Sequence, residues 1–209
     1  MAFRFNWLRF FFPRLIWQGY KKNALYLTFD DGPHPEVTPR VLEILSLYNI
    51  KATFFCVGKN AEEFPNVVKQ ITAQGHRIGN HTYFHDKGWR TKSAEYLKSI
   101  QLANGVLKTP LFRPPYGQIK FSLIPALKTQ GMRIIMWSWL SRDYDFKVSN
   151  QQIIQSANRI KGGDILVFHD SAKTQHRIEL LLHEILPMLL SKQFTFSTFE
   201  EHESTQKTK

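Results

Sequence analysis

Cysteine is nearly absent from this sequence, and the absence removes one class of protein at once. Only Cys56 is present among 209 residues, so no disulfide can form within the chain. Cys56 stands in the apolar run 52–57, where a buried structural thiol is expected rather than a reactive one. A disulfide-held scaffold is therefore excluded, whereas both a reducing compartment and export remain compatible with the sequence.

Long hydrophobic runs are also missing. Residues 1–17 are rich in Phe and Trp, but three arginines and a proline interrupt them, and no small-residue cleavage site is evident. The stretch is too short and too charged to cross a bilayer, so we predict neither a transmembrane span nor a signal peptide. We expect residues 1–22 to form an aromatic, basic extension that packs on the domain or lies at a membrane surface.

Acidic residues are in deficit. Lys and Arg number 28 against 17 Asp and Glu, which gives a net charge of +11 and a pI near 9.8. This balance favours anionic surroundings such as nucleic acid, anionic lipid or an acidic cell-wall polymer. No nucleic-acid-binding signature is present, so we expect no nucleic-acid partner but peripheral contact with membrane or cell wall. The oligomeric state is not fixed, and a monomer is favoured. The compartment stays unassigned, with the cell envelope, a membrane surface and the cytoplasm all open.

What the sequence does contain is a regular alternation of strand-like and helix-like segments. The expected strands are 25–30, 52–57, 76–82, 111–113, 132–139, 164–168 and 194–199. The expected helices are 38–48, 62–73, 93–107, 122–130, 151–160 and 178–190. Such alternation predicts an α/β fold with a parallel sheet, a distorted (β/α) barrel of about seven units, with an open doubly wound sheet as the alternative. We assign 23–200 to one domain and 201–209 to a polar tail.

Polar side chains gather where these strands end. They are Asp30 and Asp31, His81 and His85, Arg113, Asp143 and Asp145, and His169 and Asp170. In a parallel barrel the carboxyl ends of all strands lie on one face, where active sites are found. Five segments that are remote in sequence are therefore expected to meet at one pocket.

Three of these residues suit a metal ion. His81 and His85 are four apart, a spacing that lets two imidazoles reach one ion, and Asp31 would complete a set of three ligands with an open position. We expect Zn²⁺, with Co, Ni or Mn as alternatives. Because the side chains of adjacent residues diverge, Asp30 is better suited to act as a base on water than as a further ligand.

With these residues in view, the sequence resembles the polysaccharide deacetylase family, the NodB-homology domain of carbohydrate esterase family four. The resemblance rests on five motifs in the family's order: TFDDGP at 28–33, HTYFH at 81–85, RPPYG at 113–117, WLSRDY at 139–144 and VFHD at 167–170. The first three motifs are highly specific, and the last two are looser. The resemblance covers the chain from about Leu25 to just past His169.

The resemblance implies a role for each motif residue. It makes Asp30 the general base, which Arg113 holds in its ionised form, and it makes Asp31, His81 and His85 the metal ligands. His169 would be the general acid, tuned by Asp143. The oxyanion and substrate would be met by Pro115 and by the backbone N–H of Tyr116, with Tyr144 and Val167 at the acetyl pocket and groove wall.

Two positions depart from the family pattern. Tyr144 stands where Trp is common, and Val167 stands where Leu is common, so the acyl pocket or substrate groove is expected to differ somewhat. Trp89, Trp137 and Trp139 are candidates for stacking on sugar rings.

The function that follows is metal-dependent removal of N-acetyl groups from an N-acetylglucosamine-containing glycan, such as peptidoglycan, a chitin-type oligomer or another cell-envelope glycan. Two alternatives stay open. One is a related hydrolase of an amide, an imide or an O-acetyl ester on the same fold. The other is a non-catalytic glycan-binding module, for which Asp30 and His169 would serve no purpose.

Overall fold

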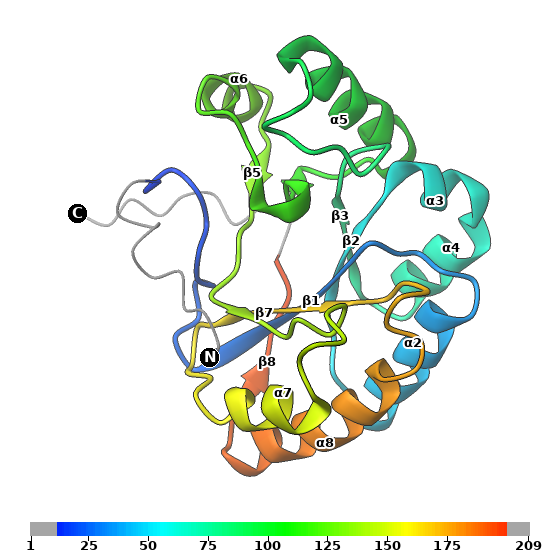
Figure 1. Ribbon diagram of the computed structural model, residues 1–209, viewed down its shortest axis with the longest axis vertical. Coiled ribbons are helices and arrows are strands. Elements are labelled where there is room, and N and C mark those ends of the chain that lie inside the picture. The colour runs from blue at the N-terminus through cyan, green and yellow to red at the C-terminus, as the bar shows by residue number, and fades with distance from the viewer. Residues whose placement is uncertain (1–11, 200–209) are drawn as a thin grey trace.

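The computed structural model of the protein describes residues 12–199, and its centre is a curled sheet of parallel strands. The strand order is β5-β4-β3-β2-β1-β7-β6, and β8 also pairs with β1. The strands are β1 (Ala24–Asp30), β2 (Thr53–Cys56), β3 (Arg77–Asn80), β4 (Leu111–Phe112), β5 (Arg133–Ile134), β6 (Trp139–Leu140), β7 (Ile165–His169) and β8 (Thr195–Phe196). The sheet forms a half-barrel with helices on its outer side (Figure 1), which confirms the predicted α/β fold.

Strands β1 and β7 are neighbours in the sheet, and both are buried at every residue. Apolar, β-favouring runs of this kind suit a parallel sheet that is covered on both faces. Phe29 of β1 stacks on Phe54 of β2 and on Phe168 of β7, with ring centroids 5.0 and 6.1 Å apart. The register pairs Asp30 with His169, so two of the predicted site residues lie side by side at the carboxyl end of the sheet.

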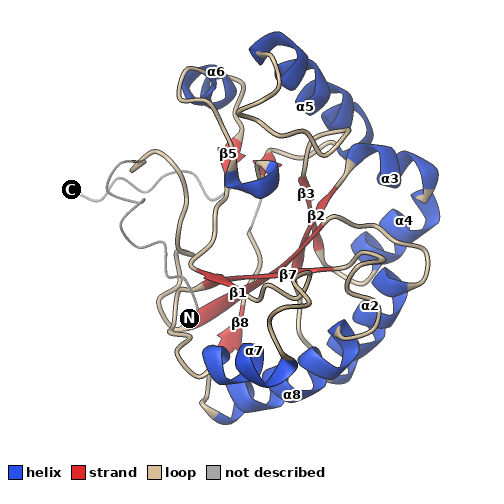
Figure 2. Cartoon of the chain, viewed as in Figure 1, coloured by secondary structure: helices blue, strands red, loops and turns tan. Residues whose placement is uncertain are grey.

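The helices pack around the outside of the half-barrel (Figure 2). They are α2 (Val37–Leu47), α3 (Gly58–Glu63), α4 (Pro65–Ala73), α5 (Ser93–Leu107), α6 (Leu123–Thr129), α7 (Asn150–Ala157) and α8 (Ile178–Ser191), with a 3₁₀ turn, η1 (Pro115–Gly117). Helix α8 buries Leu181, Ile185 and Leu189 at intervals of four residues, which is the pattern of a helix that packs one face against a sheet.

Two expected helices differ from the prediction. The predicted helix 62–73 is two helices, α3 and α4, because the chain turns at Phe64 and Pro65 opens the second helix at a position that needs no backbone donor. The predicted helix 38–48 begins at Val37 and ends at Leu47. The Thr38 hydroxyl does not cap this helix, because it takes part in the turn after β1 instead.

The prediction of one strand over 132–139 was wrong. Strand β5 pairs with β4, whereas β6 pairs with β7 at the opposite end of the sheet. Between them the chain crosses the gap, and its carbonyl groups meet other partners: Arg113 donates to the oxygens of Ile135 and Met136. The barrel is therefore open between β5 and β6.

Residues close to the N-terminus span that opening. Ile16 donates to the carbonyl of Ile134 at 2.9 Å and accepts from the N–H of Met136 at 2.7 Å, and Gly19 donates to the carbonyl of Gly163 at 2.9 Å. The segment thus joins the β5 side of the sheet to the start of β7. Residues 1–11 and 200–209 lie outside the described residues, so membrane contact by the extension and the polar tail stay predictions. Within residues 12–199 no helix is long and apolar enough to cross a membrane.

Candidate metal centre and active site

Asp31, His81 and His85 come together at the carboxyl end of the sheet. One ligand atom from each lies within 4.8 Å of the other two. The Asp31 Oδ1 atom is 3.0 Å from His85 Nε2 and 3.6 Å from His81 Nε2. Two imidazole nitrogens and one carboxylate oxygen, brought together by loops after β1 and β3, fit a divalent metal ion of the zinc type.

The ring of His81 is held in the form that a metal ligand needs. Its Nδ1 lies 2.8 Å from the carbonyl oxygen of Arg113, which can only accept, so Nδ1 carries the proton and Nε2 keeps its lone pair toward Asp31. Burial lowers the pKa of His81 to about 4, despite the nearby charges of Asp30 and Asp31. The imidazole is therefore neutral at pH 7 and able to bind an ion.

The turn that carries Asp31 is fixed by the side chains of Asp170 and Thr38. Asp170 Oδ1 accepts from the N–H of Gly32 at 3.2 Å, and Oδ2 accepts from the Thr38 hydroxyl at 2.6 Å. A Cβ atom at Gly32 would lie 2.2 Å from the Asp170 carboxylate, so only glycine fits there. Asn60 Nδ2 donates to the Asp31 carbonyl at 2.9 Å from the other side.

Histidine side chains near this turn favour the ionised form of Asp31. Burial opposes ionisation, but the hydrogen bond from His85 and the charge of His169 hold the pKa of Asp31 well below its usual range. Burial raises the pKa of Asp170, by contrast, to about 8. The two carboxyl groups, one beside the presumed ion and one behind the turn, are thus in different electrostatic settings.

Asp30 points to a different partner from Asp31. Its Oδ1 accepts from Arg113 Nη1 at 2.7 Å, and the same Nη1 donates to the Thr28 hydroxyl at 2.7 Å. The Arg113 side chain is completely buried, and its guanidinium also lies 4.0 Å from the centroid of the Phe55 ring. A buried ion pair whose hydrogen bonds are satisfied holds a carboxylate in one orientation.

His169 and Asp143 form a second buried pair. Asp143 Oδ1 is 2.6 Å from His169 Nδ1, and Oδ2 accepts from the backbone N–H of His169 at 2.8 Å. Burial alone would lower the pKa of His169, but the charge and hydrogen bond of Asp143 outweigh it and raise the pKa to about 9. The imidazole is thus protonated near neutrality, and its Nδ1 is held by Asp143.

Several site residues have a positive backbone φ angle, which residues other than glycine rarely adopt. The non-glycine residues with positive φ in the loops of this face are Asp31, Thr82, His85, Tyr116 and Arg142. Left-handed backbone at such residues costs about 1–3 kcal/mol each and tends to gather at functional sites. Two of the three presumed ligands, Asp31 and His85, therefore owe their positions to strained turns.

A cavity of ≈ 290 Å³ opens over these groups. It is lined by Asp30, Asp31, His81, His85, Tyr116, Trp137, Leu140, Tyr144, Val167, His169 and Lys173. The ring of Tyr144 meets His169 edge-on with centroids 4.9 Å apart, and the ring of Tyr116 lies 4.8 Å from that of His85. Pro115 is buried in η1 and does not line the cavity, whereas Val167 and Tyr144 do.

The sequence motifs did not assign several residues of the site. Asp170 and Thr38 support the turn of Asp31, and Leu140 and Lys173 line the cavity. The available signal for Asp170 was its place directly after His169, the last residue of β7, although no motif gave it a role. Of the two tryptophans near β6, Trp137 lines the cavity, whereas Trp139 is buried against Phe168.

Comparison with known proteins agrees with this geometry. The profile of the family described as polysaccharide deacetylase matches residues 18–135. A peptidoglycan-N-acetylglucosamine deacetylase of Bacillus cereus is 36% identical over 200 residues, which cover 90% of this chain and 71% of the relative. A chitooligosaccharide deacetylase of Azorhizobium caulinodans is 34% identical over 156 residues, which cover 71% of this chain and 74% of the relative.

A solved structure is similar over nearly the whole chain. It is a peptidoglycan N-acetylglucosamine deacetylase in complex with 4-naphthalen-1-yl-N-oxidanyl-benzamide, with a TM-score of 0.85 and 33% sequence identity. The likeness covers 93% of this chain and 94% of that one. The fold, the family profile and the identity to two deacetylases agree with the five motifs, and the chain belongs to the polysaccharide deacetylase family.

Proposed function

We propose that this protein removes N-acetyl groups from N-acetylglucosamine units of a cell-envelope glycan, with Zn²⁺ held by Asp31, His81 and His85. The observation that carries the proposal is that one cavity is lined by two groups able to transfer protons, a carboxylate and an imidazole, each held in a buried pair. Asp30 is paired with Arg113, His169 is paired with Asp143, and both Asp30 and His169 line the cavity that Asp31, His81 and His85 line. A glycan-binding module would have no use for two such buried pairs.

Each group then has a task in amide hydrolysis. Asp30, oriented by its ion pair with Arg113, takes a proton from the attacking water. The backbone N–H of Tyr116, in the η1 turn beside His85, donates to the oxygen of the acetamide as negative charge develops there. A divalent ion bound by the three ligands supplies Lewis-acid polarisation of the carbonyl and lowers the pKa of the attacking water.

His169 completes the reaction. Asp143 holds its Nδ1, so Nε2 is the nitrogen free to donate a proton to the departing amine. The C–N bond of the acetamide breaks, acetate is released, and the sugar keeps a free amine. The raised pKa of His169 keeps this acid charged at neutral pH.

The surroundings of the cavity suit a polymer that extends past the reacting sugar. A second hollow of ≈ 500 Å³ adjoins the cavity and shares Asp31, His85 and Lys173 with it. Lys59, Asn60 and Tyr83 give this side polar groups for sugar hydroxyls or for acidic substituents of a cell-wall glycan.

The substrate preference is open to one specific alternative. Tyr144 and Val167 both line the cavity where the acyl group would lie, and both depart from the family pattern. A related activity on a formyl amide, an imide or an O-acetyl ester would therefore use the same residues. A panel of substrates separates these activities.

The test measures acetate released by zinc- or cobalt-loaded protein from N-acetylglucosamine oligomers, peptidoglycan and acetylated xylan. Formate from formylated amides and the ring-opened product of cyclic amides are measured beside it. We expect turnover of the N-acetylated glycans and background release by the Asp30→Asn variant. If the loaded protein released no acetate from any of the N-acetylated glycans, the proposed function would be wrong.

A further inference from the structure

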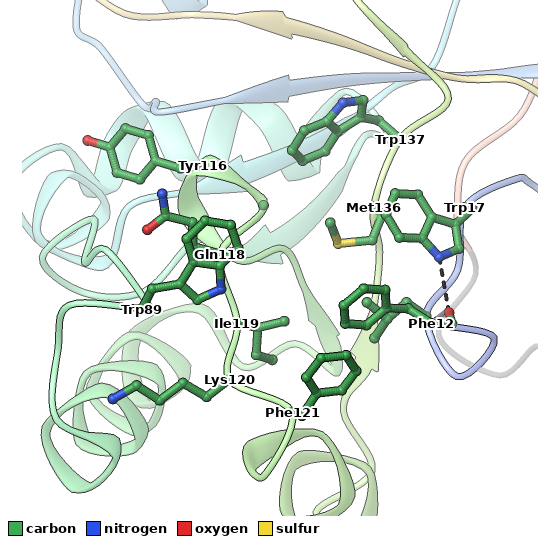
Figure 3. Close-up of a pocket in the computed structure, with 12 residues that line it drawn as sticks. Phe12, Trp17, Trp89, Tyr116, Gln118, Ile119, Lys120, Phe121, Met136 and Trp137 are labelled. Atoms are coloured by element: carbon green, nitrogen blue, oxygen red, sulfur yellow. Dashed lines mark hydrogen bonds between the residues drawn. The ribbon is translucent and has the colours of Figure 1, made fainter. Parts of the chain in front are cut away.

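An apolar groove lies beside the cavity and shares no lining residue with the polar hollow. It has a volume of ≈ 680 Å³, and it shares Tyr116 and Trp137 with the cavity, so the two are continuous. Its lining is Phe12, Leu15, Trp17, Trp89, Tyr116, Gly117, Gln118, Ile119, Lys120, Phe121, Met136 and Trp137 (Figure 3). We call it the aromatic groove.

The wall of the aromatic groove is built by contacts within the protein. Phe12 stacks on Phe121 with ring centroids 4.3 Å apart and planes 8° from parallel. The indole N–H of Trp17 donates to the Phe12 carbonyl at 3.1 Å, and the N–H of Leu15 donates to the same oxygen. The segment that spans the opening between β5 and β6 therefore also forms the outer side of the groove.

Polar groups in the groove are few, and the protein itself uses two of them. The Trp17 N–H is bonded to Phe12, and the Lys120 ammonium donates to the carbonyl of Thr91 at 2.7 Å. A sugar buried here would leave hydroxyl groups without partners, and each such group is costly. Hydrocarbon, which needs no partner, gains from the same surroundings.

The polar and apolar residues are also segregated along the groove. Figure 3 shows Tyr116, Gln118 and Trp89 at one end, and Phe12, Phe121 and Met136 at the other. Tyr116, at the polar end, is shared with the cavity where the acetamide is proposed to react. Among the described residues that line the groove, none is acidic and one, Lys120, is basic. Such a gradient fits an amphiphile with its sugar in the cavity and its chain along the groove.

We propose that the aromatic groove binds a hydrocarbon chain attached to the sugar, and hence that the protein accepts lipid-linked N-acetylated sugars as well as free glycans. This inference rests on the proposed function for the reacting sugar, but the groove can be tested without turnover. The occupant is a chain of methylene groups, each of which gains about fourfold in affinity when buried at about 0.8 kcal/mol.

The binding test uses octyl β-D-glucoside below its micelle concentration and methyl β-D-glucoside, neither of which carries an acetamide. Each is titrated into the full-length protein and followed by calorimetry and by the fluorescence of the groove tryptophans. We expect octyl glucoside to bind at least tenfold more tightly than methyl glucoside. Equal affinities would overturn the proposal.

A matched pair of variants locates the binding. Phe121 is 63% exposed and lies outside the catalytic groups, so Phe121→Ser is expected to fold and to lose at least threefold in octyl glucoside affinity. Phe146, which is 73% exposed and does not line the groove, gives the control Phe146→Ser with unchanged affinity. An equal loss in both variants would place the binding elsewhere and contradict the proposal.

Turnover separates this inference from the proposed function. We expect the KM of octyl N-acetylglucosaminide to be at least tenfold below that of the methyl glycoside, and Phe121→Ser to leave acetate release from chitooligomers unchanged. Turnover of both glycosides with equal KM would keep the proposed function and overturn the groove. Tight octyl glucoside binding without acetate release from any substrate would keep the groove proposal and overturn the proposed function.

Other occupants of the groove would show themselves in the same experiments. If octyl glucoside bound more weakly as protein concentration rose, and sedimentation showed a dimer, a second copy of the chain would fill the groove. If Trp7→Ser raised octyl glucoside affinity by tenfold or more, the N-terminal extension would be the occupant. Either result would overturn the proposal.

Discussion

At the scale of single residues, Asp30 and Asp31 are neighbours in the chain with separate surroundings. Asp30 ends β1 and meets the buried guanidinium of Arg113, whereas Asp31 has a φ of 78° and turns toward His81 and His85. Alternation along the strand and the left-handed turn after it send the two carboxylates in different directions. Their proposed roles, base and ligand, follow from that divergence.

The division of labour predicts different losses for two substitutions. Asp31→Ala should lose bound metal and activity together, because it removes one of three ligands. Asp30→Asn should retain metal and lose turnover by about 10²–10⁴-fold, which is the usual contribution of a general base. Metal content by mass spectrometry and acetate release measure the two effects, and loss of metal in both variants would contradict the assignment.

A second prediction at this scale concerns pH. His169 acts as an acid only when protonated, and its pKa is raised from 6.5 to about 9, so kcat/KM should fall as pH rises through the upper part of that range. The same shift stabilises the folded protein fully below pH 6.5, and this contribution is lost as pH rises through 9. Asp143→Asn removes the charge that raises the pKa, so the basic limb should move to lower pH.

The control for this pH prediction is Asp145→Asn. Asp145 is paired with Arg142 and does not contact His169, so its basic limb should stay in place. Because Asp31 also raises the pKa of His169, the variants are compared at equal metal loading. A profile for Asp143→Asn that superimposes on that of the unaltered protein would rule out the tuning role.

At the scale of elements, the loop between β1 and α2 is held by groups from two other parts of the chain. Thr38, in the first turn of α2, accepts from the N–H of His34 at 2.8 Å and donates to Asp170, which follows β7. Asp170 in turn accepts from Gly32 and donates its own N–H to the Asp30 carbonyl at 3.2 Å. Hydrogen bonds thus lock the turn that carries Asp31 to α2 and to the segment after β7.

Thr38→Val tests this lock because it keeps the shape of the side chain and removes the hydroxyl. Asp170 and the His34 N–H would lose a buried partner, so we expect a loss of about 1–3 kcal/mol in the free energy of unfolding. We also expect weaker metal binding, since the turn carries Asp31. Urea unfolding and competition with a chelating dye measure the two effects.

The matched control is Thr72→Val. Thr72 is exposed on α4, and its hydroxyl bonds only to carbonyls of its own helix, so the stability change should stay within about 0.5 kcal/mol. Metal affinity should not change in this variant. If Thr38→Val behaved like Thr72→Val in both measurements, the lock would have no energetic importance.

At the scale of the whole molecule, the half-barrel is open between β5 and β6, and residues 15–19 cross the opening. Ile16 pairs with Ile135 on one side, and Gln18 pairs with Asp164 on the other. The segment buries Leu15 against the cluster that includes Ile134 and Met136. The N-terminal end of the described chain therefore takes the place that another barrel strand would fill.

Ile16→Pro should weaken this closure. Proline removes the N–H that donates to the Ile134 carbonyl and leaves that buried carbonyl without its partner, which costs about 1–3 kcal/mol of unfolding free energy. Ile16→Val keeps the N–H and is the matched control, with an expected loss of about 0.5–1.5 kcal/mol. Thermal unfolding compares the two, and equal melting temperatures would show that the backbone bond does not hold the segment.

The sequence by itself determined the alternation of strands and helices, the parallel sheet and the residues at the strand ends. The run 25–30, for example, is largely apolar over the length of a strand and ends in a carboxylate. Such a local pattern predicts the strand correctly because the parallel sheet buries every residue of it. The motif residues Asp30, Asp31, His81, His85, Arg113, Asp143 and His169 could be chosen in the same way, since chemical type and chain order are local properties.

Only the tertiary structure decided which distant residues contact these segments. The run 132–139 looks like one strand, but long-range partners, Ile16 and the Arg113 guanidinium, take its backbone groups and divide it between opposite ends of the sheet. Asp170 and Thr38 are 132 positions apart, and no local signal links them. The aromatic groove likewise arises because the N-terminal segment packs beside η1 across the opening, a contact that depends on the whole fold rather than on either segment.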